Sequence, residues 1–212
     1  MVSRESKTSR DRHAGSGQKR ARPLDGATLR DLALSYVARF GTTAAKLEAY
    51  LARKIRERGV AEDADGRTET LDIAGLVSDF VEAGYVDDAA YAKARSRDLT
   101  ARGYGGRRVE QALWAAGVAE VTRSEYAPGE GAARRAAAVL ARKRRFGPYG
   151  APVQGDPLAA RKRREKHVAA MLRAGHPYEH AAFICDASDP AQVDAWADEV
   201  DDREEGEEHT GW

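Results

Sequence analysis

The sequence has 212 residues, of which 33% are charged, 42% hydrophobic and only 7% aromatic, and its formal net charge is +1. With a mean hydropathy of -0.63, these values describe a soluble protein of one or two domains and exclude a chain embedded in a membrane. Alanine is abundant and aromatic residues are few, a composition that suits closely packed helices better than a sheet sandwich. We therefore predict an all-α fold.

The near-neutral net charge hides three segments of strong and opposite charge. Residues 1–22 carry seven Lys or Arg against two acidic residues, so their net charge is +5. Residues 123–175 carry thirteen against four, a net charge of +9, whereas residues 186–212 carry one against eleven, a net charge of -10. Because segregated charge guides association more than the sum does, we expect the basic body to attract anionic partners.

Residues 1–26 are predicted to be a basic arm, rich in Ser, Gly, Lys and Arg. A segment of this composition buries too little apolar surface to offset its ordering entropy, so we expect disorder. It contains no apolar run long enough for a signal peptide, and no later run reaches the roughly 18 residues of a membrane span. With Cys185 as the single cysteine, these observations predict a cytoplasmic protein that contacts no membrane.

Residues 27–84 are predicted to form three helices, which make up a first repeat. The first helix has an apolar stripe at helical spacing that contains Leu29, Leu32, Ala33, Tyr36, Val37 and Phe40. The second and third helices have the stripes Leu47, Tyr50, Leu51, Ile55 and Leu76, Val77, Phe80, Val81. We find no convincing strand anywhere in the chain.

Residues 85–147 are predicted to form a second repeat, which begins with two adjacent carboxylates, Asp87 and Asp88. They lie between Gly84 and the next apolar stripe, where a carboxylate accepts hydrogen bonds from free backbone N–H groups and favours the helix dipole. We interpret the pair as a helix cap rather than an acid–base site. Gly103 is expected to end the same helix.

Three turn glycines, Gly41, Gly103 and Gly175, indicate a long-period repeat. The sixth residue after each is Leu47, Val109 or Ala181, and the ninth and tenth are Tyr50-Leu51, Ala112-Leu113 or Ile184-Cys185. Each glycine follows one amphipathic helix and precedes another, and the glycines are 62 and 72 residues apart. The chain is therefore predicted to be an elongated array of three tandem three-helix repeats.

The last part of the chain is divided by composition into a linker, a third repeat and a tail. Residues 148–157 are a Gly/Pro-rich linker, residues 158–200 the third repeat, and residues 201–212 an acidic tail expected to be disordered. We consider two roles for the tail, an intramolecular screen over the basic residues and a solubilising segment.

Three segments carry a resemblance to a known family. Residues 84–92 (GYVDDAAYA), 102–113 (RGYGGRRVEQAL) and 116–118 (AGV) resemble the RecX regulatory proteins of bacterial recombination, and the repeat extends the resemblance over residues 27–186. The resemblance implies three tandem three-helix repeats without catalytic residues. It also implies binding in the groove of a RecA recombinase filament on single-stranded DNA, where such proteins restrain ATP hydrolysis, strand exchange and co-protease action.

Basic side chains along the predicted helices are the candidate functional residues. Lys and Arg attract phosphate and release counterions, and they also fit acidic grooves on a protein filament. We expect successive repeats to present these charges on one concave face. The candidates for filament or DNA contact are Arg95, Arg97, Arg102, Arg107, Arg108, Arg142, Lys143, Arg144, Arg145, Arg161, Lys162, Arg163, Arg164 and Lys166.

No catalytic residue, metal site or cofactor is predicted. His176 and His180 have i, i+4 spacing but no third ligand at a suggestive distance, so we interpret them as surface or capping residues. Cys185 aligns with core leucines and has no organised His or Asp partner, so we interpret it as a core residue rather than a nucleophile.

Two function classes remain open. One is a regulator that binds a recombinase filament, and the other is a general helical nucleic-acid-binding protein without a recombinase partner. Composition and charge fit both, and the motif over residues 84–113 favours the first. We expect a monomer, since no heptad pattern or broad exposed apolar stripe indicates self-association.

Overall fold

The structure, a computed structural model, describes residues 22–62, 65–151 and 155–200. Within these ranges it contains only helices and no named strand, so the predicted all-α class is confirmed. Residues 1–21 of the predicted arm, residues 152–154 of the predicted linker and the predicted acidic tail, 201–212, lie outside the described residues. The helices are α1 (Gly26–Val37), α2 (Ala44–Arg58), α3 (Ile73–Glu82), α4 (Asp88–Ala101), α5 (Gly106–Trp114), α6 (Glu120–Glu125), α7 (Glu130–Arg144), the 3-10 helix η1 (Gly147–Tyr149), α8 (Pro157–Arg173), α9 (Tyr178–Asp186) and α10 (Pro190–Asp198).

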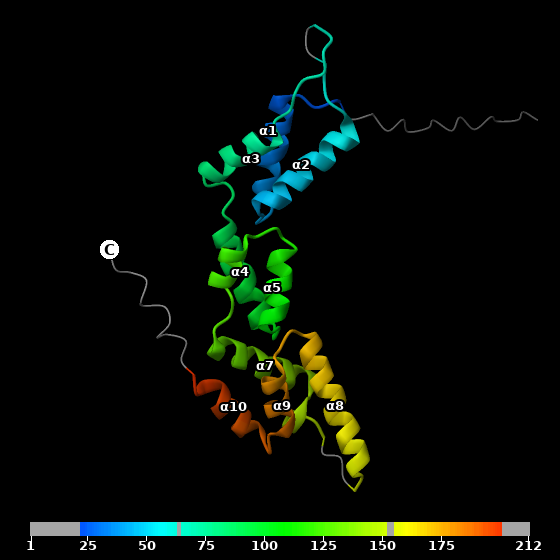
Figure 1. The fold of residues 1–212 in the computed structure, drawn as a ribbon, viewed down its shortest axis with the longest axis vertical. Coiled ribbons are helices and arrows are strands. Elements are labelled where there is room, and N and C mark those ends of the chain that lie inside the picture. Colours follow the sequence, from blue (N-terminus) through cyan, green and yellow to red (C-terminus); the bar gives the residue numbers. More distant parts are fainter. Residues whose placement is uncertain (1–21, 63–64, 152–154, 201–212) are drawn as a thin grey trace, which may run out of the picture.

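The helices follow one another along an elongated molecule, as predicted. Helices α1 to α3 occupy one end, α4 and α5 the middle, and α7 to α10 the other end (Figure 1). Three separate clusters of buried side chains form the cores of these groups. Each core is small, so the described part of the chain buries its apolar surface in three places instead of one.

The alanine-rich face of α7 packs into the last of these cores. Ala137 and Ala141 of α7 share a cluster with Val168 and Met171 of α8 and Ile184 of α9. Small side chains allow helix backbones to approach closely, so α7 packs tightly against the helices around it. Helix α7 also contacts α4, so it connects the middle group to the last group.

The first repeat begins earlier in the chain than its predicted boundary. Leu24, within the predicted basic arm, is fully buried in the first core, and its backbone N–H donates to the carbonyl oxygen of Gly59 at 3.0 Å. Asp25 then caps α1 by accepting a hydrogen bond from the N–H of Thr28 at 2.7 Å. Residues 22–26 are therefore part of the repeat, because one buried leucine anchors them.

Asp87 caps α4, as predicted, whereas Asp88 also caps a helix of the first repeat, which was not predicted. Asp87 is the N-cap of α4, and its carboxylate accepts a hydrogen bond from the N–H of Ala90 at 2.8 Å. Asp88 also accepts a hydrogen bond at 2.9 Å from the N–H of Ala44, the first residue of α2. A carboxylate of the second repeat thus satisfies a free N–H group at the start of a first-repeat helix.

The glycine turns are similar but not identical. Gly103 and Gly175 have φ of 91° and 95°, conformations that favour glycine, whereas Gly41 has no positive φ. The core position ten residues after Gly41 and Gly103 is a fully buried leucine, but Cys185 is only half-buried at the edge of its core. Its neighbour Ile184 fills the core instead, so the predicted alignment is displaced by one residue in the third repeat.

Candidate nucleic-acid interface

The second and third repeats meet through backbone atoms at two glycine turns. The N–H of Gly105 donates to the carbonyl oxygen of Ala174 at 3.0 Å, and the N–H of Arg107 donates to that of Gly175 at 3.2 Å. A Cβ atom on Gly105 would lie 2.4 Å from the carbonyl carbon of Gly175. Only glycine allows the two backbone segments to approach this closely, so these turns fix how the repeats are joined.

A buried histidine completes this joint. His176 is fully buried, and its Nε2 lies 3.0 Å from the carbonyl oxygen of Gly103. A carbonyl oxygen only accepts, so Nε2 carries the proton and Nδ1 is the unprotonated nitrogen. Burial lowers the pKa of His176, which keeps the ring neutral.

The prediction that His176 and His180 are surface or capping residues is wrong. His180 is also buried, with its Nε2 3.1 Å from a carboxylate oxygen of Glu130 at the start of α7. The i, i+4 spacing does not place the two side chains on one helix face, because His176 lies in the turn before α9 and His180 lies within α9. Both histidines are structural contacts of the last core.

The ends of three helices converge beside this joint and form a surface pocket of about 370 Å³, which we call the Tyr104 pocket. Helix α4 ends at Ala101, α7 at Arg144 and α8 at Arg173. Arg145, which adopts the left-handed conformation with φ of 57°, ends α7. The pocket is lined by Arg102, Tyr104, Leu140, Lys143, Arg144, Phe146, Ala170, Arg173 and Ala174.

The positive charge of the Tyr104 pocket exceeds what three helix ends need. Each helix C-terminus is equivalent to about -0.5 elementary charge, so three ends offset roughly one or two cations. Arg102 is paired with Asp98 at 3.0 Å, and Lys143 donates to the carbonyl oxygen of Arg102 at 3.2 Å. Arg144 and Arg173 have no carboxylate within ion-pair distance among the described residues, and none lines the pocket. The pocket therefore suits an anionic ligand group.

Besides Arg102, four of the predicted contact residues form ion pairs, two within one helix and two between helices. Arg95 pairs with Asp98 at 3.2 Å, and Arg161 with Glu165 at 3.0 Å, each within one helix. The other two pairs, Arg142–Asp194 at 2.8 Å and Arg164–Asp186, join different helices.

Arg164 forms an ion pair with two hydrogen bonds between α8 and α9. Its guanidinium donates two hydrogen bonds to the carboxylate of Asp186, at 2.5 and 2.6 Å, and joins α8 to α9. These charge-assisted bonds raise the pKa of Arg164 and lower that of Asp186. Arg164 is therefore a structural residue at the edge of the last core.

The remaining predicted residues do not line the Tyr104 pocket, and only two of them lie at the same joint. Arg107 and Arg108 are exposed in the first turn of α5, directly beside Gly175 of the same joint. Arg163 donates to the carbonyl oxygen of Ala151. The others are exposed on α4, after α7 and on α8: Arg97, Arg145, Lys162 and Lys166. The structure thus brings together Arg102, Lys143 and Arg144, with Arg107 and Arg108 nearby.

Arg173 is the functional candidate that sequence reasoning missed. It is the last residue of α8, two residues before Gly175, whereas Arg102 directly precedes Gly103. The signal that could have found it is a cation in the last turn of a helix that precedes a turn glycine.

The described ranges offer neither a metal cluster nor a bilayer-spanning helix. No group of three or more His, Cys, Asp or Glu side chains in residues 22–62, 65–151 and 155–200 is arranged to hold a metal ion. Among the same residues, no helix combines the length and apolar character needed to span a bilayer.

Comparison with known proteins agrees with the fold and with the middle motif. A family model described as the second three-helix domain of RecX matches residues 87–125. The regulatory protein RecX of Myxococcus xanthus (strain DK1622) is 32% identical over 185 residues, which are 85% of this chain and 96% of that protein. The chain belongs to the RecX family. The predicted resemblance is confirmed.

The fold of this chain is also similar to that of a RecX crystal structure. The crystal structure of RecX from Lactobacillus salivarius matches 82% of this chain and 97% of that chain with a TM-score of 0.56 at 15% identity. The residues matched by the second RecX domain, 87–125, contain α4, α5 and α6 but not α7. This range is shorter than the predicted second repeat, 85–147, and it agrees with the packing of α7 in the last core.

Proposed function

We propose that the protein is a non-enzymatic regulator of homologous recombination that binds the RecA recombinase filament on single-stranded DNA. In this proposal it mostly inhibits the ATPase, strand-exchange and co-protease activities of the filament. The observation that carries the proposal is membership of the RecX family, through 32% identity over 85% of the chain to a regulatory protein RecX. We also propose that the protein is cytoplasmic and acts as a monomer.

The interface that we propose is centred on the joint between the second and third repeats. Lys143, Arg144 and Arg173 supply cations without carboxylate partners among the described residues, and Arg107 and Arg108 extend the positive charge along α5. An elongated array suits a groove because successive repeats reach successive sites. We propose that Arg95, Arg142, Arg161 and Arg164 stay paired within the protein, with Arg142 and Arg164 joining helices, while the unpaired cations make contact.

The experiment that tests the proposal measures ATP hydrolysis by the host recombinase on single-stranded DNA while this protein is titrated in. DNA binding by this protein alone is measured in parallel at several salt concentrations. We expect hydrolysis to fall at protein amounts well below those that coat the DNA, because a regulator recognises the filament. The variant Lys143→Gln/Arg144→Gln/Arg173→Gln should need more protein for the same effect.

The competing function is a general nucleic-acid-binding protein without a recombinase partner. It predicts that hydrolysis falls only as the DNA becomes saturated, since the protein then competes for the lattice. This outcome would contradict filament recognition and leave DNA binding as the activity. Arg161→Gln is the matched control, because Arg161 lies on α8 in an exposed pair with Glu165. This substitution should leave both the inhibition of ATP hydrolysis and the DNA binding unchanged.

A further inference from the structure

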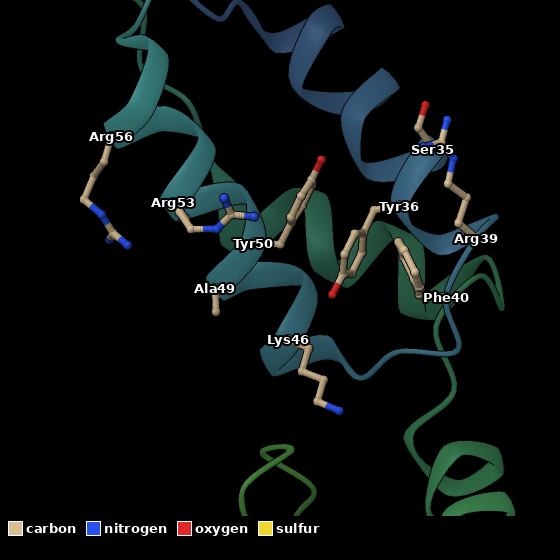
Figure 2. Close-up of a pocket in the computed structure, with 9 residues that line it drawn as sticks. All are labelled: Ser35, Tyr36, Arg39, Phe40, Lys46, Ala49, Tyr50, Arg53 and Arg56. Atoms are coloured by element: carbon tan, nitrogen blue, oxygen red, sulfur yellow. The ribbon is translucent and has the colours of Figure 1, made fainter.

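A second basic pocket lies on the first repeat, which supplied none of the predicted contact residues. It has a volume of about 730 Å³ and lies between α1 and α2, and we call it the Tyr36 pocket. Figure 2 shows side chains from both helices, and from the turn after α1, lying around it. The pocket is lined by Ser35, Tyr36, Arg39, Phe40, Lys46, Ala49, Tyr50, Arg53 and Arg56.

Three aromatic rings form a row across this pocket (Figure 2). The rings of Tyr36 and Tyr50 are stacked, with centroids 4.2 Å apart and an interplanar angle of 15°. The ring of Phe40 follows Tyr36 at 5.4 Å with a tilt of 49°. Tyr36 and Tyr50 are half-buried against the first core, but Phe40 is 55% exposed. The row therefore ends in a ring that is open to a further flat partner.

The cations around the rings come mainly from one face of α2. Lys46, Arg53 and Arg56 have spacings that place them on the side of α2 that faces the pocket, and Arg39 follows α1 beside Phe40. No carboxylate lines the pocket. The described residues include no carboxylate within ion-pair distance of Arg39 or Arg56, whereas Arg53 pairs with Glu57 at 2.6 Å.

The structure assigns a ligand class to this combination: we propose that the Tyr36 pocket binds an unpaired nucleotide of single-stranded DNA. The base stacks on the exposed ring of Phe40, Arg39 holds the phosphate beside it, and Arg56, at the other end of the ring row, holds a phosphate farther along the strand (Figure 2). A row of aromatic rings beside cations is the arrangement that binds single strands, because every base has a π-face and only unpaired bases expose it. The volume also lies within the range of about 300–1,000 Å³ typical of small-ligand pockets. The inference rests on the proposed function only in its choice of single-stranded DNA.

An acidic peptide of a partner protein is the competing occupant. The four cations fit it, but carboxylates have no flat apolar face, so it leaves the exposed Phe40 ring without a function. Single-stranded DNA uses both the rings and the cations, and the observations therefore favour the nucleotide.

The first test compares two oligonucleotides of about 15 residues, one of thymidines and one abasic, with the full chain. Phe40→Ala should weaken binding of the thymidine strand by roughly 5- to 100-fold, the effect expected for one stacked base. It should leave binding of the abasic strand unchanged, and Phe40→Trp should restore thymidine binding. Because Phe40 is largely exposed, these variants should remain folded, which far-UV circular dichroism checks.

The matched control for Phe40 is Trp114→Ala, which removes another exposed aromatic side chain, 69% accessible, on α5 outside the pocket. Trp114→Ala should leave the affinities for the thymidine strand and for the abasic strand unchanged. The proposal is overturned if Phe40→Ala behaves as Trp114→Ala does, or if it weakens the thymidine and abasic strands equally.

The second test measures the phosphate contacts. The variant Arg39→Gln/Arg56→Gln should reduce the slope of log affinity against log salt concentration by about 1.4, since each phosphate contact on a single strand contributes about 0.7. Arg30→Gln is the matched control, because Arg30 lies on α1 and pairs with Asp79 at 3.8 Å. An unchanged slope in the double variant would overturn the phosphate assignment.

The recombinase ATPase assay separates failure of this inference from failure of the proposed function. If the wild-type protein inhibits the filament while Phe40→Ala binds thymidine strands normally, the pocket assignment is wrong and the regulator proposal stands. If Phe40→Ala loses inhibition but not DNA affinity, the pocket binds a protein surface, and the nucleotide proposal is overturned. If the wild-type protein has no effect on the filament but Phe40→Ala loses DNA affinity, the pocket assignment stands alone.

Discussion

The Nε2 atom of His176 lies 3.0 Å from the carbonyl oxygen of Gly103, and this contact joins the turn before α9 to the turn after α4 across the joint between two repeats. The other ring nitrogen, Nδ1, is buried and has no hydrogen-bond partner among the described residues. Protonation would place an N–H group and a positive charge there without an acceptor. The joint is therefore built around a neutral histidine.

The first prediction is that the free energy of unfolding falls as the pH falls below about 6.5. Burial lowers the pKa of His176, and also that of His167, from the usual value of 6.5. Between the unfolded-state pKa and the lowered folded-state pKa, the unfolded chain binds protons that the folded chain does not, so acid favours unfolding. Each such group contributes up to about 1.4 kcal/mol per pH unit in that window. Urea unfolding from about pH 7.5 to about pH 5.5 measures the slope.

His176→Gln supplies the control for this slope. Glutamine keeps a donor near the Nε2 position and does not titrate, so the variant should show a weaker pH dependence whatever its absolute stability. Parallel curves for the wild type and His176→Gln would mean that His176 does not couple to folding.

The second prediction concerns the glycine turns. In Gly175→Ala the new Cβ would lie 2.4 Å from the backbone nitrogen of Arg108, at a residue whose φ is +95°. The left-handed conformation alone costs about 1–2 kcal/mol for a residue with a Cβ, so we expect the free energy of unfolding to fall by at least about 2 kcal/mol. Gly41→Ala is the matched control, because a Cβ at Gly41 has nothing within 4 Å and its φ is not positive. It should be neutral or stabilising by up to about 1 kcal/mol. Equal decreases in urea unfolding would contradict this account of the joint.

The third prediction concerns the reactivity of Cys185. Burial raises the pKa of its thiol from 9.0 to about 11. Only the thiolate is alkylated, so at about pH 8 iodoacetamide should react roughly 100-fold more slowly than with an ordinary thiol. In denaturing urea the rate should become ordinary, and the ratio of the two rates is the measurement. Fast alkylation of the folded protein would show that the thiol is more accessible than its position at the core edge indicates.

The parts of this fold that sequence predicts are those that local chemistry determines. The apolar spacing through Leu47 and Leu51 defines one face of α2, because the helical period is a property of a short segment. Asp87 was identifiable as a cap for the same reason, since its hydrogen bond reaches only as far as Ala90.

The parts that sequence did not predict depend on how separate segments dock. The hydrogen bond from Ala44 to Asp88 spans 44 residues, and the burial of His176 depends on a close approach of two glycine turns. The membership of α7 in the last core likewise depends on which helices cover its alanine face. The same limit applies to the candidate site. Charge runs identified Lys143 and Arg144, but the convergence of three helix ends added Arg173.

The last prediction separates contact residues from structural ones among the predicted cations. The variant Lys143→Gln/Arg144→Gln/Arg173→Gln should lower the slope of log affinity against log salt concentration for single-stranded DNA by about 2, at about 0.7 for each phosphate that is no longer neutralised. Each substitution also removes a favourable charge from a helix C-terminus, which costs about 0.3–1 kcal/mol, so the protein should remain folded. Arg142→Gln is the control, because Arg142 precedes Lys143 on α7 but pairs with Asp194 at 2.8 Å. Its slope should match that of the wild type, while its unfolding free energy falls by no more than about 1 kcal/mol because the pair is exposed. If Arg142→Gln changes the slope as much as one substitution in the triple variant does, then ion pairing within the protein does not decide which cations meet the DNA.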